Sequence, residues 1–326
     1  MGIEEVFKRF NDLRVLIVGD VMIDAYIWGA VERVSPEAPV PVVRVTKRDY
    51  RLGGAANVAL NVQALGATPI LCSVIGNDEA GERFKERLAD RKLLDDGIVQ
   101  SSNRLTTVKT RVISGHQHVV RVDEETDELL SRDVENELLV RIENLLSNCD
   151  VVIFEDYDKG AVTDRVIRQT ITRASELDIP SVVDPKKRNF LKYEGATLFK
   201  PNLKELREGL KIDIDPKKKG DIEMATLQLK DVLKVNGALI TLSEHGVFMD
   251  YNGEKHLMPA HIREVSDVSG AGDTVISIAA LCLALKLGVK QIAALSNLGG
   301  GLVCEHVGVV PINREVLLKE ASQIDF

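Results

Sequence analysis

The chain has 326 residues, of which 44% are hydrophobic and 28% are charged, and its formal net charge at pH 7 is −8. This composition is typical of an ordinary globular protein, and the chain is long enough to bury a sizeable core. A net acidic chain lacks the broad basic surface that nucleic acids and anionic membranes require, which argues against partners of either class. An anionic substrate would instead need a local cluster of basic side chains.

No segment of the sequence predicts membrane insertion. Residues 1–14 are charged and lack the apolar centre of a signal peptide. The longest apolar run, 275–287, is shorter than the ~20 residues of a membrane-spanning helix and predicts a buried helix instead. The four cysteines have no metal-ligand or CxxC spacing, so we expect free thiols in a reducing compartment and a cytoplasmic protein. They are Cys72, Cys149, Cys282 and Cys304.

Short apolar runs rich in β-branched residues recur between amphipathic stretches. The runs are continuous rather than alternating, which is typical of strands buried on both faces of a mainly parallel sheet. They cover residues 15–18, 70–74, 151–154, 181–183, 197–199 and 238–241, and the helical stretches include 80–91, 133–147 and 163–177. This alternation predicts a three-layer α/β fold, in which ligands bind beyond the carboxyl ends of the strands.

Two segments break this rhythm. Residues 26–45 and 106–122 alternate polar with apolar side chains, as antiparallel strands outside the main sheet would. We expect the two segments to pair into a small β-sheet lid, with ordinary edge strands as the alternative. Because no repeat or Gly/Ser linker interrupts the chain, we expect one domain over residues 1–326.

The strongest motif, DVSGAGDT at 267–274, directly precedes the predicted buried helix. Free backbone amides at a helix start, together with the helix dipole, favour an anion there. Gly270 and Gly272 would let a phosphate approach the main chain. Asp273, in the first turn, could then accept a proton from a hydroxyl that attacks a phosphoryl group. The alternative is that Asp273 only caps the helix.

A second motif, Gly53-Gly54 followed by Asn57, also marks a helix start. The glycines permit close approach of a ligand and Asn57 can bind a hydroxyl, although such a pair is also common in turns and packing. Upstream, the first strand ends without GxGxxG, which argues against a dinucleotide enzyme. Asp20 and Asp24 follow that strand at the sheet edge as candidates for sugar hydroxyls, and the alternative is that one of the two is a turn residue.

Polar groups also follow three later strands. Lys159 and Lys186 are candidate partners for anionic oxygens, although Lys186 could equally lie in a solvated loop. Asn202 and Glu205 have the spacing of a capping box. A functional interpretation of these two residues adds a role in positioning Mg²⁺ through water, because magnesium keeps several waters and needs few protein carboxylates.

These motifs occur in the order and spacing of the ribokinase-like (pfkB-type) sugar kinases, which the chain resembles over residues 13–313. The segment VSPEAPVPV at 34–42, with GDVMID at 19–24, DYDKG at 156–160 and DPK at 184–186, is similar to the kinase half of the ADP-heptose synthases. The resemblance implies a ribokinase-like fold and binding of ATP and Mg²⁺, with K⁺ as a further expected monovalent ion.

The resemblance also implies roles for individual residues. Asp273 would be the general base, beside an anion hole built from the amides of Gly270, Ala271 and Gly272. The nucleotide side would comprise Asn202, Leu203, Lys204, Glu205, Ser243, Gly246 and Asp267, with Glu205 reaching Mg²⁺ through water. The sugar would contact Asp24, Gly53, Gly54 and Asn57, and its phosphate or the lid side would meet Lys159, Lys109 and Arg111.

The reaction implied is ATP-dependent phosphorylation of D-glycero-β-D-manno-heptose 7-phosphate at C1, an early step towards the lipopolysaccharide core. The resemblance also implies a homodimer, because the lid of this family often pairs between two subunits. No HxGH motif occurs, so we expect no nucleotidyltransferase domain and a separate enzyme for adenylyl transfer. The alternatives are another ribokinase-like kinase acting on a sugar, sugar phosphate or nucleoside, and a non-catalytic sugar or nucleotide sensor.

Overall fold

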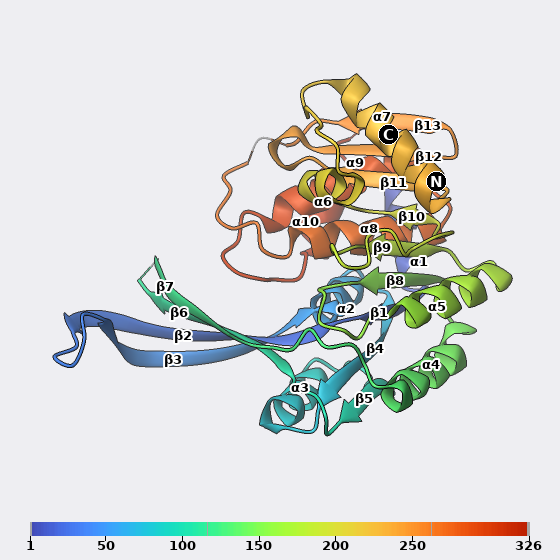
Figure 1. The fold of residues 1–326 in the computed structure, drawn as a ribbon. Helices are drawn as coiled ribbons and strands as arrows, with labels where there is room; N and C mark the ends of the chain where they lie inside the picture. Colours follow the sequence, from blue (N-terminus) through green and yellow to red (C-terminus); the bar gives the residue numbers. More distant parts are fainter. Residues whose placement is uncertain (1, 116, 262, 325–326) are drawn as a thin grey trace.

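The main sheet has nine strands in the order β13-β12-β11-β10-β9-β8-β1-β4-β5 (Figure 1). The structure is a computed structural model that describes residues 2–115, 117–261 and 263–324. Position 116 of the predicted lid segment and positions 1, 262, 325 and 326 of the predicted domain lie outside the described residues.

Seven strands of this sheet are parallel and the last two form an antiparallel hairpin at one edge. The parallel strands are β1 (Arg14–Gly19), β4 (Thr68–Gly76), β5 (Gly97–Ser101), β8 (Val151–Glu155), β9 (Ser181–Asp184), β10 (Leu198–Phe199) and β11 (Gly237–Thr241), and the hairpin is β12 (Val247–Tyr251) with β13 (Glu254–Met258). All six predicted strands are present. The sequence analysis missed β5 and the hairpin.

Helices cover both faces of the main sheet, as the three-layer prediction requires. Alternate residues of β1 point to opposite layers: Val15 and Ile17 join one hydrophobic core, Leu16 and Val18 the other. The first core packs α1 (Ile3–Phe10), α2 (Ala55–Ala64), α3 (Glu79–Asp90), α8 (Ala271–Ala284), α9 (Val289–Val303) and α10 (Arg314–Ala321), and the second packs α4 (Arg132–Leu146), α5 (Asp164–Glu176), α6 (Leu203–Leu210) and α7 (Lys219–Leu233). Within the part of the chain described, no helix is both long and apolar enough to cross a membrane.

A second sheet of four strands projects from the main one, in the order β3-β2-β6-β7 (Figure 1). Its strands are β2 (Val21–Val34), β3 (Pro41–Gly54), β6 (Thr107–Ser114) and β7 (Gln117–Glu124). Both predicted lid segments therefore lie in a separate sheet, and the edge-strand alternative is wrong. We name this sheet the lid.

The lid departs from the prediction in two respects. β2 and β6 pair in parallel, so the lid is mixed rather than wholly antiparallel. Its first strand also begins at Val21, with only Asp20 between it and the end of β1, and β3 runs on to Gly54 at the start of α2. Asp24 consequently lies on the lid and not at the edge of the main sheet.

Candidate functional site

Asp273 lies in the first turn of α8 with its side chain buried, at 5% relative exposure. Its carboxylate accepts hydrogen bonds from Asn57 Nδ2 at 2.6 Å and from the hydroxyl of Tyr157 at 3.1 Å. The helix cap is Gly270, and no side chain caps this helix. The capping alternative for Asp273 is therefore wrong, because its carboxylate faces a polar cluster.

The start of α8 needs glycine at one position and space at another. Gly270 has φ +82°, in the left-handed region, and a Cβ there would stand 3.2 Å from Asn57 Nδ2. A Cβ on Gly272 would make only ordinary contacts, at 3.5 Å from Asp184 Oδ2 and Lys200 Nζ. Gly272 therefore lies over the ion pair of these two side chains, and a methyl group there would meet no clash within the protein.

The amides of this turn do not all match the predicted anion hole. The N–H of Ala271 donates to the carbonyl of Val268 at 3.3 Å. The N–H groups of Gly272 and Asp273 fall in the first helical turn, where intrahelical acceptors are lacking. An anion at this helix start would therefore be met by the Gly272 and Asp273 amides rather than by that of Ala271.

Beneath Asp273, two neighbouring strands end in acidic residues. Glu155 ends β8 and Asp184 ends β9, and the two are paired in register. One carboxylate oxygen from each of Glu155, Asp184 and Asp273 lies within 4.8 Å of the others. Lys200 binds Asp184 at 2.8 Å, and both of these side chains are buried. Lys200 therefore offsets one charge of a cluster that carries three acids.

Burial decides the protonation of this cluster. It is the main cause that raises the pKa of Glu155 well above its usual value, and the charges of Asp184 and Asp273 raise it further. The pKa of Asp273 is raised by burial as well, while the hydrogen bond from Asn57 opposes the rise. Glu155 Oε2 has no hydrogen-bond partner among the described residues. The sequence analysis missed Glu155, Lys200 and the contact of Tyr157 with Asp273.

The glycine pair before α2 is explained largely by packing. A Cβ on Gly53 would stand 2.2 Å from Asp24 Oδ2, and one on Gly54, which has φ +60°, would stand 2.4 Å from the carbonyl oxygen of Asp20. The packing alternative for the pair is thus correct in part. The same close approach places Asn57, one turn later in α2, against Asp273.

Asp20 is the turn residue of the two candidate carboxylates after β1. Its side chain accepts hydrogen bonds from the amides of Tyr157 (2.9 Å), Lys159 (3.1 Å) and Ala161 (2.9 Å). These bonds shape the loop that follows β8. That loop brings the Tyr157 hydroxyl to Asp273 and carries Lys159 towards the lid.

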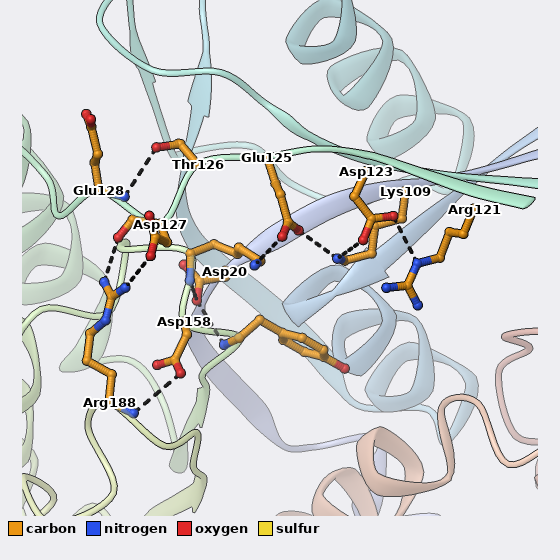
Figure 2. A network of polar contacts seen from close by, with 12 residues as sticks. Asp20, Lys109, Arg121, Asp123, Glu125, Thr126, Asp127, Glu128, Asp158 and Arg188 are labelled. Atoms are coloured by element: carbon orange, nitrogen blue, oxygen red, sulfur yellow. Dashed lines mark hydrogen bonds and ion pairs between the residues drawn. The ribbon is translucent and has the colours of Figure 1, made fainter.

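The predicted basic residues gather where the lid meets this loop, and each is paired with an acid. Figure 2 shows the contact of Lys109 with Glu125. Lys109 on β6 binds Glu125 at 2.7 Å, and Lys159 binds the same carboxylate at 2.8 Å. Arg111, two residues along β6, forms an ion pair with Asp24. Three cations and Asp24 thus lie together on one side of the lid.

The nucleotide-side motif forms the capping box expected from its spacing. Asn202 Oδ1 accepts from the amide of Glu205 at 2.8 Å, and Glu205 Oε2 accepts from the amide of Asn202 at 2.9 Å. Glu205 Oε1 accepts from Lys186 Nζ at 2.8 Å, so the solvated-loop alternative for Lys186 is wrong. The ammonium lies 5.2 Å from the ring centre of Tyr157, which binds Asp273. The motif is thereby linked to Asp273.

Lys186 carries its charge in this setting. Burial tends to lower the pKa of Lys186, but the carboxylates of Asp184 and Glu205 outweigh burial and raise it above its usual range. Its ammonium is therefore a permanent cation between the two acids, beside the loop of Tyr157.

The remaining nucleotide-side candidates lie around this motif in different ways. Leu203 is partly buried against the second core, and the Lys204 side chain is 83% exposed. Ser243 and Gly246 flank a short turn after β11, which neighbours the motif because Thr241 bridges to Asn202. The structure therefore brings the Ser243 turn to the motif, whereas the Lys204 side chain points to solvent.

The carboxylate of Asp267 is hydrogen-bonded to backbone amides of the protein. Its two carboxylate oxygens accept hydrogen bonds from the amides of Ser269 and Gly308, both at 2.9 Å. Burial opposes ionisation of Asp267, yet these bonds hold its pKa below the usual value. Asp267 therefore holds the turn that leads into α8.

The oxygen groups around Asp273 fit a hard divalent cation such as Mg²⁺. Both oxygens of Glu205 are engaged by Asn202 and Lys186, which suits contact with a cation through water. The orphan Oε2 of Glu155, beside Asp184, supplies the kind of donor that magnesium prefers. The residues present thus fit the ion that the resemblance implies.

Comparisons with known proteins agree with this geometry. The model of the pfkB family carbohydrate kinases matches residues 12–315. Among curated proteins, the "Bifunctional protein HldE" of Campylobacter curvus is 39% identical over 317 residues, covering 96% of this chain and 67% of that protein. The protein of the same name from Syntrophotalea carbinolica is 38% identical, covering 97% of this chain and 64% of that protein. The chain spans about two thirds of the length of these relatives.

Solved structures share the fold at low sequence identity. Phosphofructokinase-2 from Escherichia coli in complex with potassium has a TM-score of 0.77 and 17% identity, covering 95% of this chain and 98% of that chain. Arabidopsis thaliana ribokinase complexed with ribose and ATP has a TM-score of 0.74 and 16% identity, covering 96% and 99%. The three-layer sheet with its lid is thus the ribokinase-like fold. From the family match across nearly the whole chain, this protein belongs to the pfkB family of carbohydrate kinases.

Proposed function

We propose that this carbohydrate kinase transfers the γ-phosphoryl group of ATP to the C1 hydroxyl of D-glycero-β-D-manno-heptose 7-phosphate, giving the 1,7-bisphosphate for ADP-heptose and lipopolysaccharide core synthesis. The observation that carries the proposal is the buried carboxylate of Asp273, held by Asn57 and Tyr157 beside the free amides of a helix start. Similarity to proteins named HldE supports the choice of sugar.

Asp273 acts as the general base in this proposal. A carboxylate whose pKa is raised by burial binds a proton more readily than an exposed one, so it takes the proton of the attacking C1 hydroxyl efficiently. Asn57 and Tyr157 fix the direction of its lone pairs. The hydroxyl oxygen then forms its bond to γ-phosphorus as the bond to the ADP oxygen breaks.

The start of α8 stabilises the charge on the phosphoryl group in transfer. The amides of Gly272 and Asp273 point along the positive end of the helix dipole, and Lys186 and Lys200 lie nearby as buried or partly buried cations. Bound with ATP, Mg²⁺ neutralises charge on the β- and γ-phosphates. Glu205, through water, together with Glu155 and Asp184, would hold the ion.

The lid side of the cluster recognises the sugar. Asp24 and Asn57 offer acceptors and donors for hydroxyls, and the 7-phosphate would meet Lys109, Lys159 and Arg111. We extend the proposal to one kinase domain over 1–326, dimerisation through the lid in the cytoplasm, and use of the product by a nucleotidyltransferase activity. A monovalent ion such as K⁺ is supported by the potassium complex of a structural neighbour.

Coupled measurement of ADP release tests the proposal. Heptose 7-phosphate, fructose 6-phosphate, ribose and adenosine are offered at equal concentration with ATP and Mg²⁺. We expect the highest kcat/KM with heptose 7-phosphate, and a loss in kcat on the order of 10² or more in Asp273→Asn. No turnover of heptose 7-phosphate alongside good turnover of another acceptor would reject the assigned sugar. Full activity of Asp273→Asn would reject the base.

A further inference from the structure

One carboxylate, that of Glu125, bridges the two lysines assigned to the sugar phosphate (Figure 2). Its Oε2 lies 2.7 Å from Lys109 Nζ and its Oε1 lies 2.8 Å from Lys159 Nζ. Lys109 belongs to the lid strand β6, whereas Lys159 belongs to the loop after β8. Glu125 therefore joins the lid to the body of the protein through a pair of charge-assisted hydrogen bonds.

The bridge resembles the contacts that a phosphate group would make. Two ammonium groups that bind two oxygens of one anion at such distances are a typical phosphate arrangement. The lysine side chains are only 15% and 16% exposed, so an incoming phosphate could not bind them fully while the carboxylate stays. The carboxylate is a strong competitor, because the lysine hydrogen bonds outweigh partial burial and hold the pKa of Glu125 below its usual value.

The lysines are more firmly fixed than the carboxylate. The amide of Lys159 donates to Asp20 and its carbonyl accepts from Arg104, while Lys109 is paired on both sides within the lid. Glu125 follows the end of β7, outside any helix or strand, and its side chain is 28% exposed. A rotation of its side chain towards solvent would free Lys159 and would leave Lys109 with only its longer contact, 3.3 Å to Asp123 Oδ2, without moving either backbone.

We propose that Glu125 is a specificity-determining residue: it occupies the phosphate-binding lysines of the empty enzyme and yields them only to a phosphorylated sugar. The inference rests on the proposed function. A phosphate carries close to two charges and three acceptor oxygens against one charge and two oxygens for a carboxylate, so it can displace Glu125. The uncharged terminal hydroxyl of a free sugar cannot, and the lid stays tied to the body.

Kinetics of Glu125→Gln test this role, with Glu124→Gln as the matched control. Glu124 is the exposed neighbour at the end of β7 and changes the net charge equally. In Glu125→Gln we expect the KM for heptose 7-phosphate to fall about tenfold with kcat within about twofold of wild type, because the competing charge is gone. The kcat/KM for unphosphorylated heptose should rise above its wild-type value, because the lid is then no longer tied to the body by the Glu125 carboxylate, and Glu124→Gln should match wild type.

Calorimetric titration with inorganic phosphate tests the same point without turnover. Glu125→Gln should bind inorganic phosphate about tenfold more tightly than wild type, and adding Lys159→Met should cancel the gain. An unchanged or weakened affinity in Glu125→Gln would overturn the inference, because Glu125 would then only position the lysines. Lack of wild-type turnover with heptose 7-phosphate would reject the proposed sugar instead, and the phosphate titration would still decide the role of Glu125.

Discussion

The two hydrogen bonds to Asp273 set its affinity for a proton. Burial raises the pKa of Asp273, and the bonds from Asn57 and Tyr157 pull it back. The proposed general base must be ionised to act, so kcat should fall on the acid side with an apparent pKa above the ordinary aspartate value of 3.8.

Removal of either hydrogen bond to Asp273 should move the acid limb of the pH profile, where kcat falls, to higher pH. In Asn57→Leu and Tyr157→Phe the ionised form loses a donor, so the pKa of Asp273 rises, and more so for Asn57 because its bond has the larger effect. Profiles of kcat against pH measure the shift. Tyr251→Phe, on the distant β12, serves as the control and should leave the limb in place. A shift to lower pH in Tyr157→Phe would contradict the assignment.

Glu155 should make the protein less stable as the pH rises. Its folded-state pKa lies well above the unfolded value of 4.5, so the folded state binds more protons over that interval and the free energy of unfolding falls with pH. Glu155→Gln removes this dependence. We expect a flatter profile in denaturant titrations as the pH rises above 4.5, whereas Glu86→Gln, at an exposed position, should follow wild type. A steeper decline in Glu155→Gln would contradict a neutral Glu155.

Sequence spacing predicted the parts of the site that lie within one helix start. Asp273, Asn57 and the Asn202–Glu205 box are each read from a few consecutive residues. The contacts of Glu155 and Lys200 depend instead on β8, β9 and β10 being neighbours in space, which local periodicity does not encode. The sequence did offer one signal for Glu155 and Lys200, because each directly follows a predicted strand at its carboxyl end, where ligands bind.

At the scale of elements, the two glycines at the start of α8 should affect different properties, Gly270 the stability of the fold and Gly272 the activity. Gly270 has φ +82°, so Gly270→Ala should lower the free energy of unfolding by about 1–2 kcal/mol and crowd Asn57. Gly272→Ala meets only ordinary contacts, so stability should hold while the new methyl group obstructs the anion and reduces kcat/KM. Denaturant titration and steady-state kinetics of both variants check this difference. Equal stability losses would contradict it.

Element boundaries were predicted least well where burial or polarity masks the strand period. The first six residues of β2 are all buried, so they show no alternation, and the later part of β3 is charged. The hairpin of β12 and β13, in contrast, can be predicted from its turn residues. Asn252-Gly253, both at positive φ, is a favoured two-residue hairpin turn.

At the scale of the molecule, the far part of the lid exposes apolar side chains. Val34 is 63% exposed and Val45 is 43% exposed. If the lid pairs with a second copy, the double change Val34→Glu and Val45→Glu should give monomers, because charge in a buried contact is costly. Sedimentation velocity measures the outcome, with Val140→Glu on α4 as the control for an exposed valine elsewhere. An unchanged mass for the double variant would refute lid dimerisation.

Asp20 alone separates β1 from β2, and all its polar groups are occupied. Its amide donates to the Glu155 carbonyl, its carbonyl accepts from the Ala55 amide, and its carboxylate holds the loop of Tyr157. A tilt of β2 relative to β1 would therefore strain the hydrogen bonds that Asp20 makes. Because Asp20 also holds the loop of Tyr157, a lid movement caused by the sugar phosphate would be transmitted to the tyrosine whose hydroxyl binds Asp273.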